Sequence, residues 1–280
     1  MNALETAVQT FKRGLGLSSG SRLVARMRPA YDSLLNFCYG QRGLVRVIND
    51  QDTVRIRPAH RNAAENYEPA VFNYLKRRVQ AGMMVFDVGA HVGLFTVLLA
   101  RWVGPSGRIF AFEPAPGTCA ALNDHLALNE VGDRVCVSQL AISDHEGSAF
   151  LYTIATCPEN TLSASHARLP RAQARENPVS VITIDAFCAS QSLAPDIIKI
   201  DIEGFEIHAL RGARQILGRQ RPVVVVEIHP MNWPEIGVAA AQLEQLLSEV
   251  NYRLRPLEGQ ADPLAEYGHV VLEPIESIFW

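Results

Sequence analysis

Acidic side chains stand at the ends of four short apolar runs of the sequence, and a histidine follows the last of them. These residues are Asp87, Glu113, Asp201 with Glu203, and Glu227 with His229. One acid after a strand is commonly a turn or capping residue. Acids at four strand ends predict a shared polar crevice, because ligands of doubly wound sheets bind beyond the carboxyl ends of the strands. Carboxyl and imidazole groups in such a crevice could take a proton from a hydroxyl group or hold a divalent cation.

A glycine-containing turn, GAHVG from Gly89 to Gly93, lies between the apolar runs VFDV and LFTVLLARWV. Glycine allows backbone conformations that other residues resist, and a turn before a helix offers unpaired N–H groups to a ligand. Two glycines by themselves are equally consistent with a tight corner between a strand and a helix. The turn is not G-x-G-x-x-G, because His91 stands where a pyrophosphate would require glycine. We therefore expect a cofactor that carries a ribose and no bridging phosphates.

Glu113 lies twenty residues after Gly93, at the end of the next apolar run. An acid at this position can accept hydrogen bonds from both hydroxyls of a ribose, as in dinucleotide-binding folds. S-adenosyl-L-methionine fits this description, with its adenosine at Glu113 and its cationic amino acid end at Asp87 and the glycine turn. One alternative is a nicotinamide-dependent oxidoreductase on a similar sheet. Another is a catalytically inactive cofactor-binding protein.

Composition narrows the class of protein. The 280 residues, 48% hydrophobic and 20% charged, are typical of a soluble globular chain that can bury a sizeable core. A net charge of −3 does not favour nucleic acid binding. The five cysteines are scattered without a CxxC pair, so neither a disulfide framework nor a structural zinc site is expected. We expect a cytoplasmic protein, because the sequence has no apolar run of membrane-spanning length and no recognisable signal peptide.

From residue 83 onward, short apolar runs alternate with helical patterns. Strands are expected over MMVFDV, RIFAFE, RVCVSQLAI, EGSAFLYTI, PDIIKID and PVVVVEI, and helices over GLFTVLLARWV, APGTCAALNDHLALN, GFEIHALRGARQIL and AAAQLEQLLSEV. This alternation predicts an α/β fold with a mostly parallel, doubly wound sheet. Residues 51–280 are predicted to form this domain, and residues 1–50 an N-terminal helical extension.

Two segments of the chain stand outside this alternation. The N-terminal extension is expected to begin with an amphipathic helix whose apolar face carries Leu4, Val8, Phe11 and Leu15. Residues 155–178 are polar and show no clear period, which is typical of a long functional or disordered loop.

The motifs VFDVGAHVGLFT, FAFEP, LAISDHEG, DIIKIDIEGFEIHALRGA and VVVVEIHP occur in this order. Together they resemble the FkbM family of S-adenosylmethionine-dependent methyltransferases over roughly residues 71–230. The glycine turn alone is shared by many methyltransferases, whereas KIDIEGFEIHALRGA is much more specific. The resemblance implies a Rossmann-like class I methyltransferase fold and an enzyme that methylates hydroxyl groups of sugars, glycans or polyketide-type natural products.

The resemblance also implies roles for individual residues. It assigns the cofactor turn to Asp87, Gly89, Ala90, His91 and Gly93, the ribose-binding acid to Glu113, and an adenine contact to Ile142 and Ser143. Asp201 and Glu203 follow the fourth strand, which in this fold faces the methyl group. The sequence NTLS, residues 160–163, is similar to a short polar signature in the family's variable loop.

Asp201, Glu203 and His229 are the predicted catalytic residues. We expect Asp201 nearest the transferred methyl group, with Glu203 and His229 toward the acceptor. Two acids so close resist simultaneous ionisation, so one is expected to keep a raised pKa and act as the base. A divalent cation is possible but not expected, because a hard-metal site needs several converging oxygens.

Other residues of these motifs keep two interpretations. Lys199 is either an ion-pair partner or a site residue, and His91 either a turn residue or a cofactor contact. Trp233 either packs in the core or lines an acceptor pocket. Glu206 and Arg211 are interpreted as a surface or capping pair. The acceptor is a hydroxyl-bearing small molecule or glycan whose identity the sequence does not reveal, and a homo-oligomer is possible.

Overall fold

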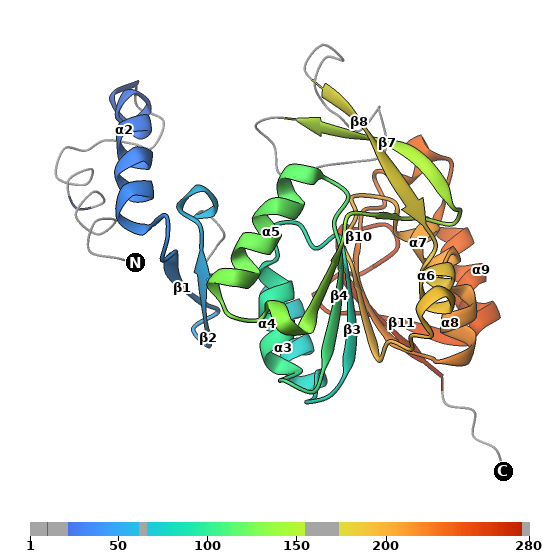
Figure 1. Cartoon of the computed structure of the whole chain (residues 1–280). Helices are drawn as coiled ribbons and strands as arrows, with labels where there is room; N and C mark the ends of the chain where they lie inside the picture. The colour runs from blue at the N-terminus through green and yellow to red at the C-terminus, as the bar shows by residue number, and fades with distance from the viewer. Residues whose placement is uncertain (1–9, 11–21, 62–65, 155–173, 276–280) are drawn as a thin grey trace.

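The computed structural model describes residue 10 and residues 22–61, 66–154 and 174–275 (Figure 1). Its centre is a seven-stranded sheet in the order β11-β12-β10-β9-β3-β4-β5. The strands are β3 (Met84–Val88), β4 (Arg108–Phe112), β5 (Val135–Ser138), β9 (Ile197–Ile200), β10 (Val223–Ile228), β11 (Tyr252–Pro256) and β12 (Gly268–Pro274). The five strands from β10 to β5 are parallel, while β12 and β11 are antiparallel to their neighbours. The predicted α/β fold with a mostly parallel sheet is confirmed.

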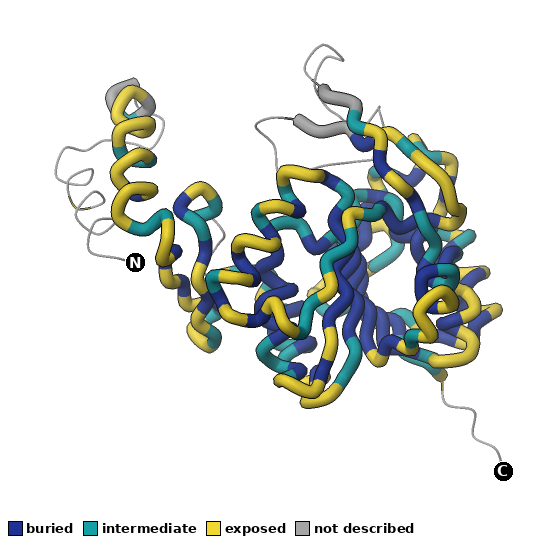
Figure 2. Tube along the Cα trace, viewed as in Figure 1, coloured by how far each residue is buried: buried dark blue, intermediate teal, exposed yellow. Residues whose placement is uncertain are grey.

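Helices cover both faces of this sheet (Figure 1). One face carries α3 (Pro69–Arg78), α4 (Leu94–Trp102) and α5 (Pro116–Leu128), and the other carries α6 (Ile184–Gln191), α7 (Glu206–Arg211), α8 (Arg214–Arg219) and α9 (Ala240–Val250). Every residue of β9 and β10 is buried, as Figure 2 shows for the centre of the molecule. Strands covered on both faces read as continuous apolar runs, which explains the sequence of β10.

Two predicted elements are each divided in the structure. RVCVSQLAI forms β5 and then β6 (Ala141–Ile142) in a second sheet, because the chain turns where Leu140 N–H donates to Ser138 O. GFEIHALRGARQIL forms α7 and α8 rather than one helix. The break lies at Gly212, where an added Cβ would lie 2.1 Å from Ser143 O, so close packing against that loop occupies the position.

The second sheet has the strand order β6-β8-β7. The predicted strand EGSAFLYTI is confirmed as β7 (Gly147–Ile154), and β8 (Ala174–Ile182) pairs with it antiparallel. Residues 174–178 of the predicted polar loop therefore belong to a strand. Residues 155–173, with the NTLS signature, lie outside the described part of the chain.

The N-terminal region contains α2 (Arg22–Tyr39) and a hairpin of β1 (Leu44–Ile48) and β2 (Asp52–Ile56). The predicted boundary at residue 50 falls in the turn of this hairpin. Buried residues of both strands join the core cluster formed by α3 and α4. The predicted amphipathic helix with Leu4 and Leu15 lies outside the described residues. No described helix is both long and apolar enough to span a membrane.

Gly89 joins the ends of β3 and β9 by direct backbone contact. It has φ +81°, and an added Cβ would lie 1.8 Å from Asp201 O. We predict that Gly89→Ala lowers the free energy of unfolding by ~2 kcal/mol or more, because backbone must move to admit the methyl group. Gly104→Ala is the control, since Gly104 also has positive φ but has no atom within 4 Å of the added Cβ.

Urea unfolding of both variants measures the difference. Gly104→Ala should show only the cost of the left-handed backbone, ~1–2 kcal/mol. Equal losses in the two variants would contradict a role for close packing at Gly89.

Candidate active site

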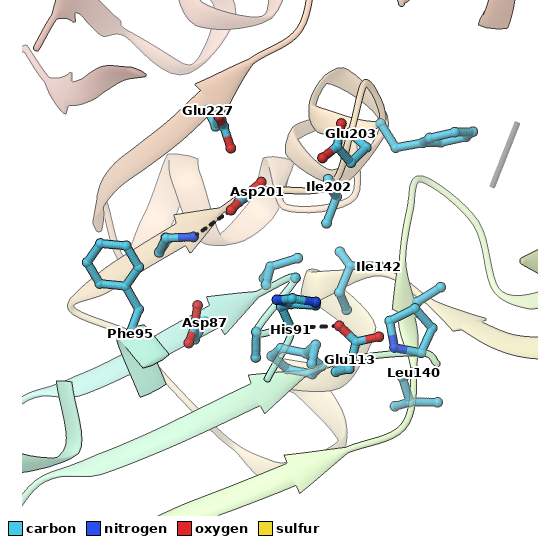
Figure 3. Close-up of a pocket in the computed structure, with 18 of the residues that line it drawn as sticks. Asp87, His91, Phe95, Glu113, Leu140, Ile142, Asp201, Ile202, Glu203 and Glu227 are labelled. Atoms are coloured by element: carbon cyan, nitrogen blue, oxygen red, sulfur yellow. Dashed lines mark hydrogen bonds and ion pairs between the residues drawn. The ribbon is translucent and has the colours of Figure 1, made fainter. Parts of the chain in front are cut away.

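A cavity of about 320 Å³ opens at the carboxyl ends of β3, β4, β9 and β10 (Figure 3). Eight of the eleven predicted site residues line it: Asp87, Gly89, Ala90, His91, Glu113, Ile142, Asp201 and Glu203. The other three, Gly93, Ser143 and His229, do not. Parallel strands deliver their following loops to one edge of the sheet, and this brings together residues more than a hundred positions apart.

The glycine turn builds one wall of the cavity. Gly89 and Ala90 N–H both donate to Phe112 O at 3.0 Å, which ties the turn to the end of β4. His91 has φ +49°, and its N–H points back to the Glu113 carboxylate. Gly93 is the N-cap of α4 and packs against α5, where an added Cβ would lie 2.1 Å from Leu122 Cδ1. Both glycines therefore allow close packing, and Gly89 also lines the cavity together with Ala90 and His91.

Glu113 is buried and held by two backbone donors. Its Oε2 accepts His91 N–H at 3.0 Å, and its Oε1 accepts Ala115 N–H at 2.8 Å. Burial raises the pKa of Glu113 to about 7, although the two backbone hydrogen bonds oppose this shift. The carboxylate faces the cavity in a fixed orientation (Figure 3).

Asp87 is fully buried at the floor of the cavity. Its Oδ2 accepts the Thr96 hydroxyl at 2.6 Å, and its Oδ1 has no hydrogen-bond partner among the described residues. Burial raises the pKa of Asp87, and Lys199 and Thr96 oppose the shift. Buried polar atoms are usually hydrogen-bonded, so this oxygen is available to a donor on a ligand.

The predicted adenine contacts separate in the structure. Ile142 lines the cavity together with Leu140 and Leu151. Ser143 is buried beside them, with its N–H donating to Ile182 O at 3.1 Å. The side of the cavity near Glu113 therefore has an apolar wall.

Lys199 is both an ion-pair partner and a residue of the cavity, the two interpretations that the sequence left open. It lines the cavity, and its Nζ lies 3.1 Å from Asp201 Oδ2 and 5.0 Å from the centre of the Phe95 ring. Burial opposes the charge of Lys199, but the surrounding acids raise its pKa above the ordinary value. Burial also tends to raise the pKa of Asp201, but the Lys199 ammonium outweighs it, so that this pKa lies well below its ordinary range. Asp201 is an anion.

Glu227, which the sequence marked only as an acid at a strand end, lines the cavity beside Asp201 (Figure 3). The Tyr267 hydroxyl donates to Glu227 Oε1. Burial, followed by the charge of Asp201, raises the pKa of Glu227 to about 8. The raised pKa expected for one acid of the Asp201–Glu203 pair is therefore carried by Glu227, because Lys199 holds Asp201 ionised.

Two further lining residues, Tyr67 and Glu68, had no sequence signal. Both precede α3, which lies outside the alternating pattern, and Glu68 adopts φ +37° at the start of that helix. His269, on the unpredicted strand β12, lies with its Nε2 3.4 Å from Glu68 Oε2 and 3.7 Å from Glu227 Oε1. Only the tertiary structure brings this histidine to the site.

The interpretation of Glu206 as a surface residue is wrong. Its side chain is fully buried. Its carboxylate accepts Gly204 N–H at 2.8 Å and Trp233 Nε1–H at 3.0 Å, and it lies 2.6 Å from His229 Nδ1. A capping contact to Gly204 does exist. Trp233 packs in the core and does not line the cavity. His229 stands behind Glu203, with its Nε2 3.4 Å from Glu203 Oε2.

The described residues contain no group of three or more His, Cys, Asp or Glu side chains arranged to hold a metal ion.

The buried Glu206–His229 pair has a pH signature. Burial lowers the pKa of His229, but the Glu206 hydrogen bond and charge outweigh it and raise the pKa from 6.5 to about 9. A pKa raised by folding stabilises the folded state below pH 6.5, and this contribution is lost as the pH rises through about 9. We predict that Glu206→Gln lowers the free energy of unfolding at neutral pH by ~3 kcal/mol or more, because it leaves a buried cation without its anion.

Urea unfolding between pH 6 and pH 10 tests this pair. The difference between wild type and Glu206→Gln should shrink as the pH rises through the upper part of the range. Glu244→Gln, on the exposed face of α9, is the control and should change stability by less than ~0.5 kcal/mol. A pH-independent difference would show that the His229 charge is not involved.

Comparison with known proteins places the chain in a family. The model of the methyltransferase FkbM domain matches residues 87–254. One relative, 31-O-demethyl-FK506 methyltransferase FkbM of Streptomyces tacrolimicus, is 29% identical over 191 residues, which cover 57% of this chain and 71% of the relative. Another, hexuronic acid methyltransferase AglP of Haloferax volcanii, is 24% identical over 185 residues, covering 65% and 68%.

Among solved structures, an O-methyltransferase of Bacillus cereus in complex with SAH has a TM-score of 0.48 and 14% identity, covering 78% of this chain and 86% of that chain. The family model covers more than half of the present chain and decides against the nicotinamide-dependent alternative. The chain belongs to the FkbM family of S-adenosylmethionine-dependent methyltransferases.

Proposed function

We propose that the protein transfers the methyl group of S-adenosylmethionine to a hydroxyl group of a sugar, glycan or polyketide-type natural product. The observation that carries the proposal is that one cavity contains both Glu113, at one side, and the Asp201–Glu227 pair, at the other. The names of two relatives support the acceptor class, since they specify 31-O-demethyl-FK506 and hexuronic acid as methylated molecules. Both molecules carry hydroxyl groups.

The residues present fit the cofactor. Each oxygen of Glu113 accepts one backbone N–H and keeps a lone pair that could accept a ribose hydroxyl. The unpartnered Oδ1 of Asp87 could accept a hydrogen bond from the amino group of the amino acid end. Leu140 and Ile142 offer an apolar surface for the adenine. The predicted cofactor roles of Gly93 and Ser143 would be indirect, through the packing of the turn and of the neighbouring loop.

When bound, the cofactor supplies an activated methyl group. The protein then has to align the acceptor hydroxyl and exclude water, which can account for a large part of the barrier lowering. We propose that Asp201 and Glu203 orient the acceptor hydroxyls from their side of the cavity. His229 lies behind Glu203 and would position its carboxylate.

Transfer of a labelled methyl group tests the proposal. Purified protein is incubated with labelled S-adenosylmethionine and a panel of neutral methyl glycosides, methyl glycosides of hexuronic acids and hydroxylated macrolides. Mass spectrometry then locates the methyl group. Label on a hydroxyl oxygen supports the proposal. Cofactor binding without transfer to any panel member, or to cell extract, would favour the catalytically inactive alternative.

Glu113 should make cofactor binding depend on pH. A ribose diol donates hydrogen bonds, so it requires the ionised carboxylate, and burial raises the pKa of this group to about 7. We predict that the affinity for S-adenosylhomocysteine falls as the pH decreases through 7. Glu113→Gln should weaken binding by ~1–3 kcal/mol above pH 7, as expected when hydrogen bonds to a charged partner are lost.

Isothermal calorimetry between pH 5.5 and 8.5 measures both effects. The pH dependence should disappear in Glu113→Gln, while the exposed Glu146→Gln should retain it as the control. Unchanged affinity in a folded Glu113→Gln protein would remove Glu113 from the cofactor site.

A further inference from the structure

We propose that Glu227, rather than Asp201, takes the proton of the acceptor hydroxyl. This inference rests on the proposed transfer of a methyl group to a hydroxyl. Glu227 was not among the predicted catalytic residues. Its position on β10, beside Asp201 and Tyr267, gives it this role.

The register of the sheet places Glu227 beside Asp201. β10 pairs in parallel with β9, with Val225 opposite Lys199 and Val226 opposite Ile200. The next positions are Glu227, still within β10, and Asp201, just past the end of β9, and both line the cavity (Figure 3). Two carboxyl groups at such neighbouring positions resist simultaneous ionisation, so one of them favours the protonated form.

Lys199 decides which carboxyl group holds the proton. Its ammonium lies 3.1 Å from Asp201 Oδ2, so the negative charge stays on Asp201 and the proton on Glu227. An acid so strongly favoured as an anion has little affinity for a proton from a hydroxyl. A base works best when its pKa lies near the operating pH, and a pKa of about 8 meets this condition for Glu227.

The groups around Glu227 come from several elements. On the β12 side, Tyr267 donates its hydroxyl to Glu227 Oε1, and His269 Nε2 lies 3.7 Å from the same oxygen. His269 also contacts Glu68, at the start of α3, and Glu258, whose Oε1 lies 3.3 Å from His269 Nδ1. The hydrogen bond from Tyr267 favours the ionised form of Glu227, whereas the Asp201 anion favours the protonated form.

Two other charges face this group. Lys199 lines the cavity from β9, and His229, just past the end of β10, lowers the pKa of Glu227. The balance of all these charges leaves a carboxyl group that changes protonation close to neutral pH.

With Glu227 ionised, the acceptor O–H bond breaks and its proton bonds to a Glu227 oxygen. The acceptor oxygen gains a bond to the methyl carbon, and the electron pair of the broken carbon–sulfur bond remains on sulfur. Glu227 then returns its proton to solvent. Because the base form exists above the pKa of Glu227, turnover should rise with pH and level off above about 8.

The first arm of the test needs no acceptor. Difference infrared titration of wild type minus Glu227→Gln follows the protonated carboxyl band between pH 5 and pH 10. We expect a band at pH 6 that disappears with a midpoint near 8. If Glu227 contributes no protonated carboxyl signal at pH 6, the proposed location of the proton is wrong and the inference fails.

The second arm measures kcat against pH at saturating S-adenosylmethionine, with the panel member that turns over best. Glu227→Gln should lose ~10²-fold or more and lose the rise with pH. Asp201→Asn removes the anion that raises the pKa of Glu227, so its pH limb should move to lower pH. Tyr267→Phe removes the donor that favours the carboxylate, so its limb should move to higher pH. Glu244→Gln should leave the profile unchanged.

The outcomes separate the inference from the proposed function. If Asp201→Asn abolishes turnover at every pH while Glu227→Gln keeps the wild-type profile, Asp201 is the base and the inference is overturned. If neither a panel member nor cell extract is methylated but the infrared titration shows the expected band, the proposed function fails and the location of the proton stands. Opposite shifts of the two pH limbs support Glu227 as the base.

Discussion

The ammonium group of Lys199 is the charge on which the site depends. It lies on a central strand that is buried throughout, where an unpaired cation would be costly. Asp201 neutralises it directly, and Asp87 and Glu68 contribute further negative charge. Acids from β3, from the end of β9 and from the start of α3 thus converge on one cation. Buried ion pairs often add little to stability. The main effect of this pair is to keep Asp201 ionised.

The two sides of the cavity hold their acids in different ways. Backbone N–H groups hold Glu113, so its orientation is set by the glycine turn and by the start of α5. Side chains hold Asp201 and Glu227, so their charges respond to one another and to Tyr267. The first arrangement suits a constant recognition of hydroxyl groups. The second suits a group that must change its protonation during turnover.

A second buried charge pair supports the loop after β9. Glu206 contacts the backbone of Gly204 and the side chains of His229 and Trp233, so one carboxylate joins this loop to the segment after β10. Glu203, at the tip of the loop, has φ +52°, a conformation that non-glycine residues adopt only when their surroundings impose it. The position of Glu203 at the cavity is therefore a product of the packing beneath it.

Sequence periodicity determined most of the central fold, because the burial of each face follows directly from the spacing of apolar residues. It also located Asp87, Glu113 and Asp201 at the site, since parallel strands bring their carboxyl ends to one edge. Periodicity does not encode long-range partners. For that reason only the tertiary structure revealed the contribution of Glu68, at the start of a helix outside the alternation. It also revealed the two antiparallel strands, one of which carries His269.

The same limit applies to charge. The sequence located Asp201 and Glu227 at neighbouring strand ends, but it contained no information on which would hold a proton. That depends on a separation of 3.1 Å between Lys199 and Asp201, and on the approach of Tyr267 to Glu227. Electrostatic energies change steeply over such distances in a buried site, so the pattern of residues determined the presence of the acids and only the packed structure decided their protonation.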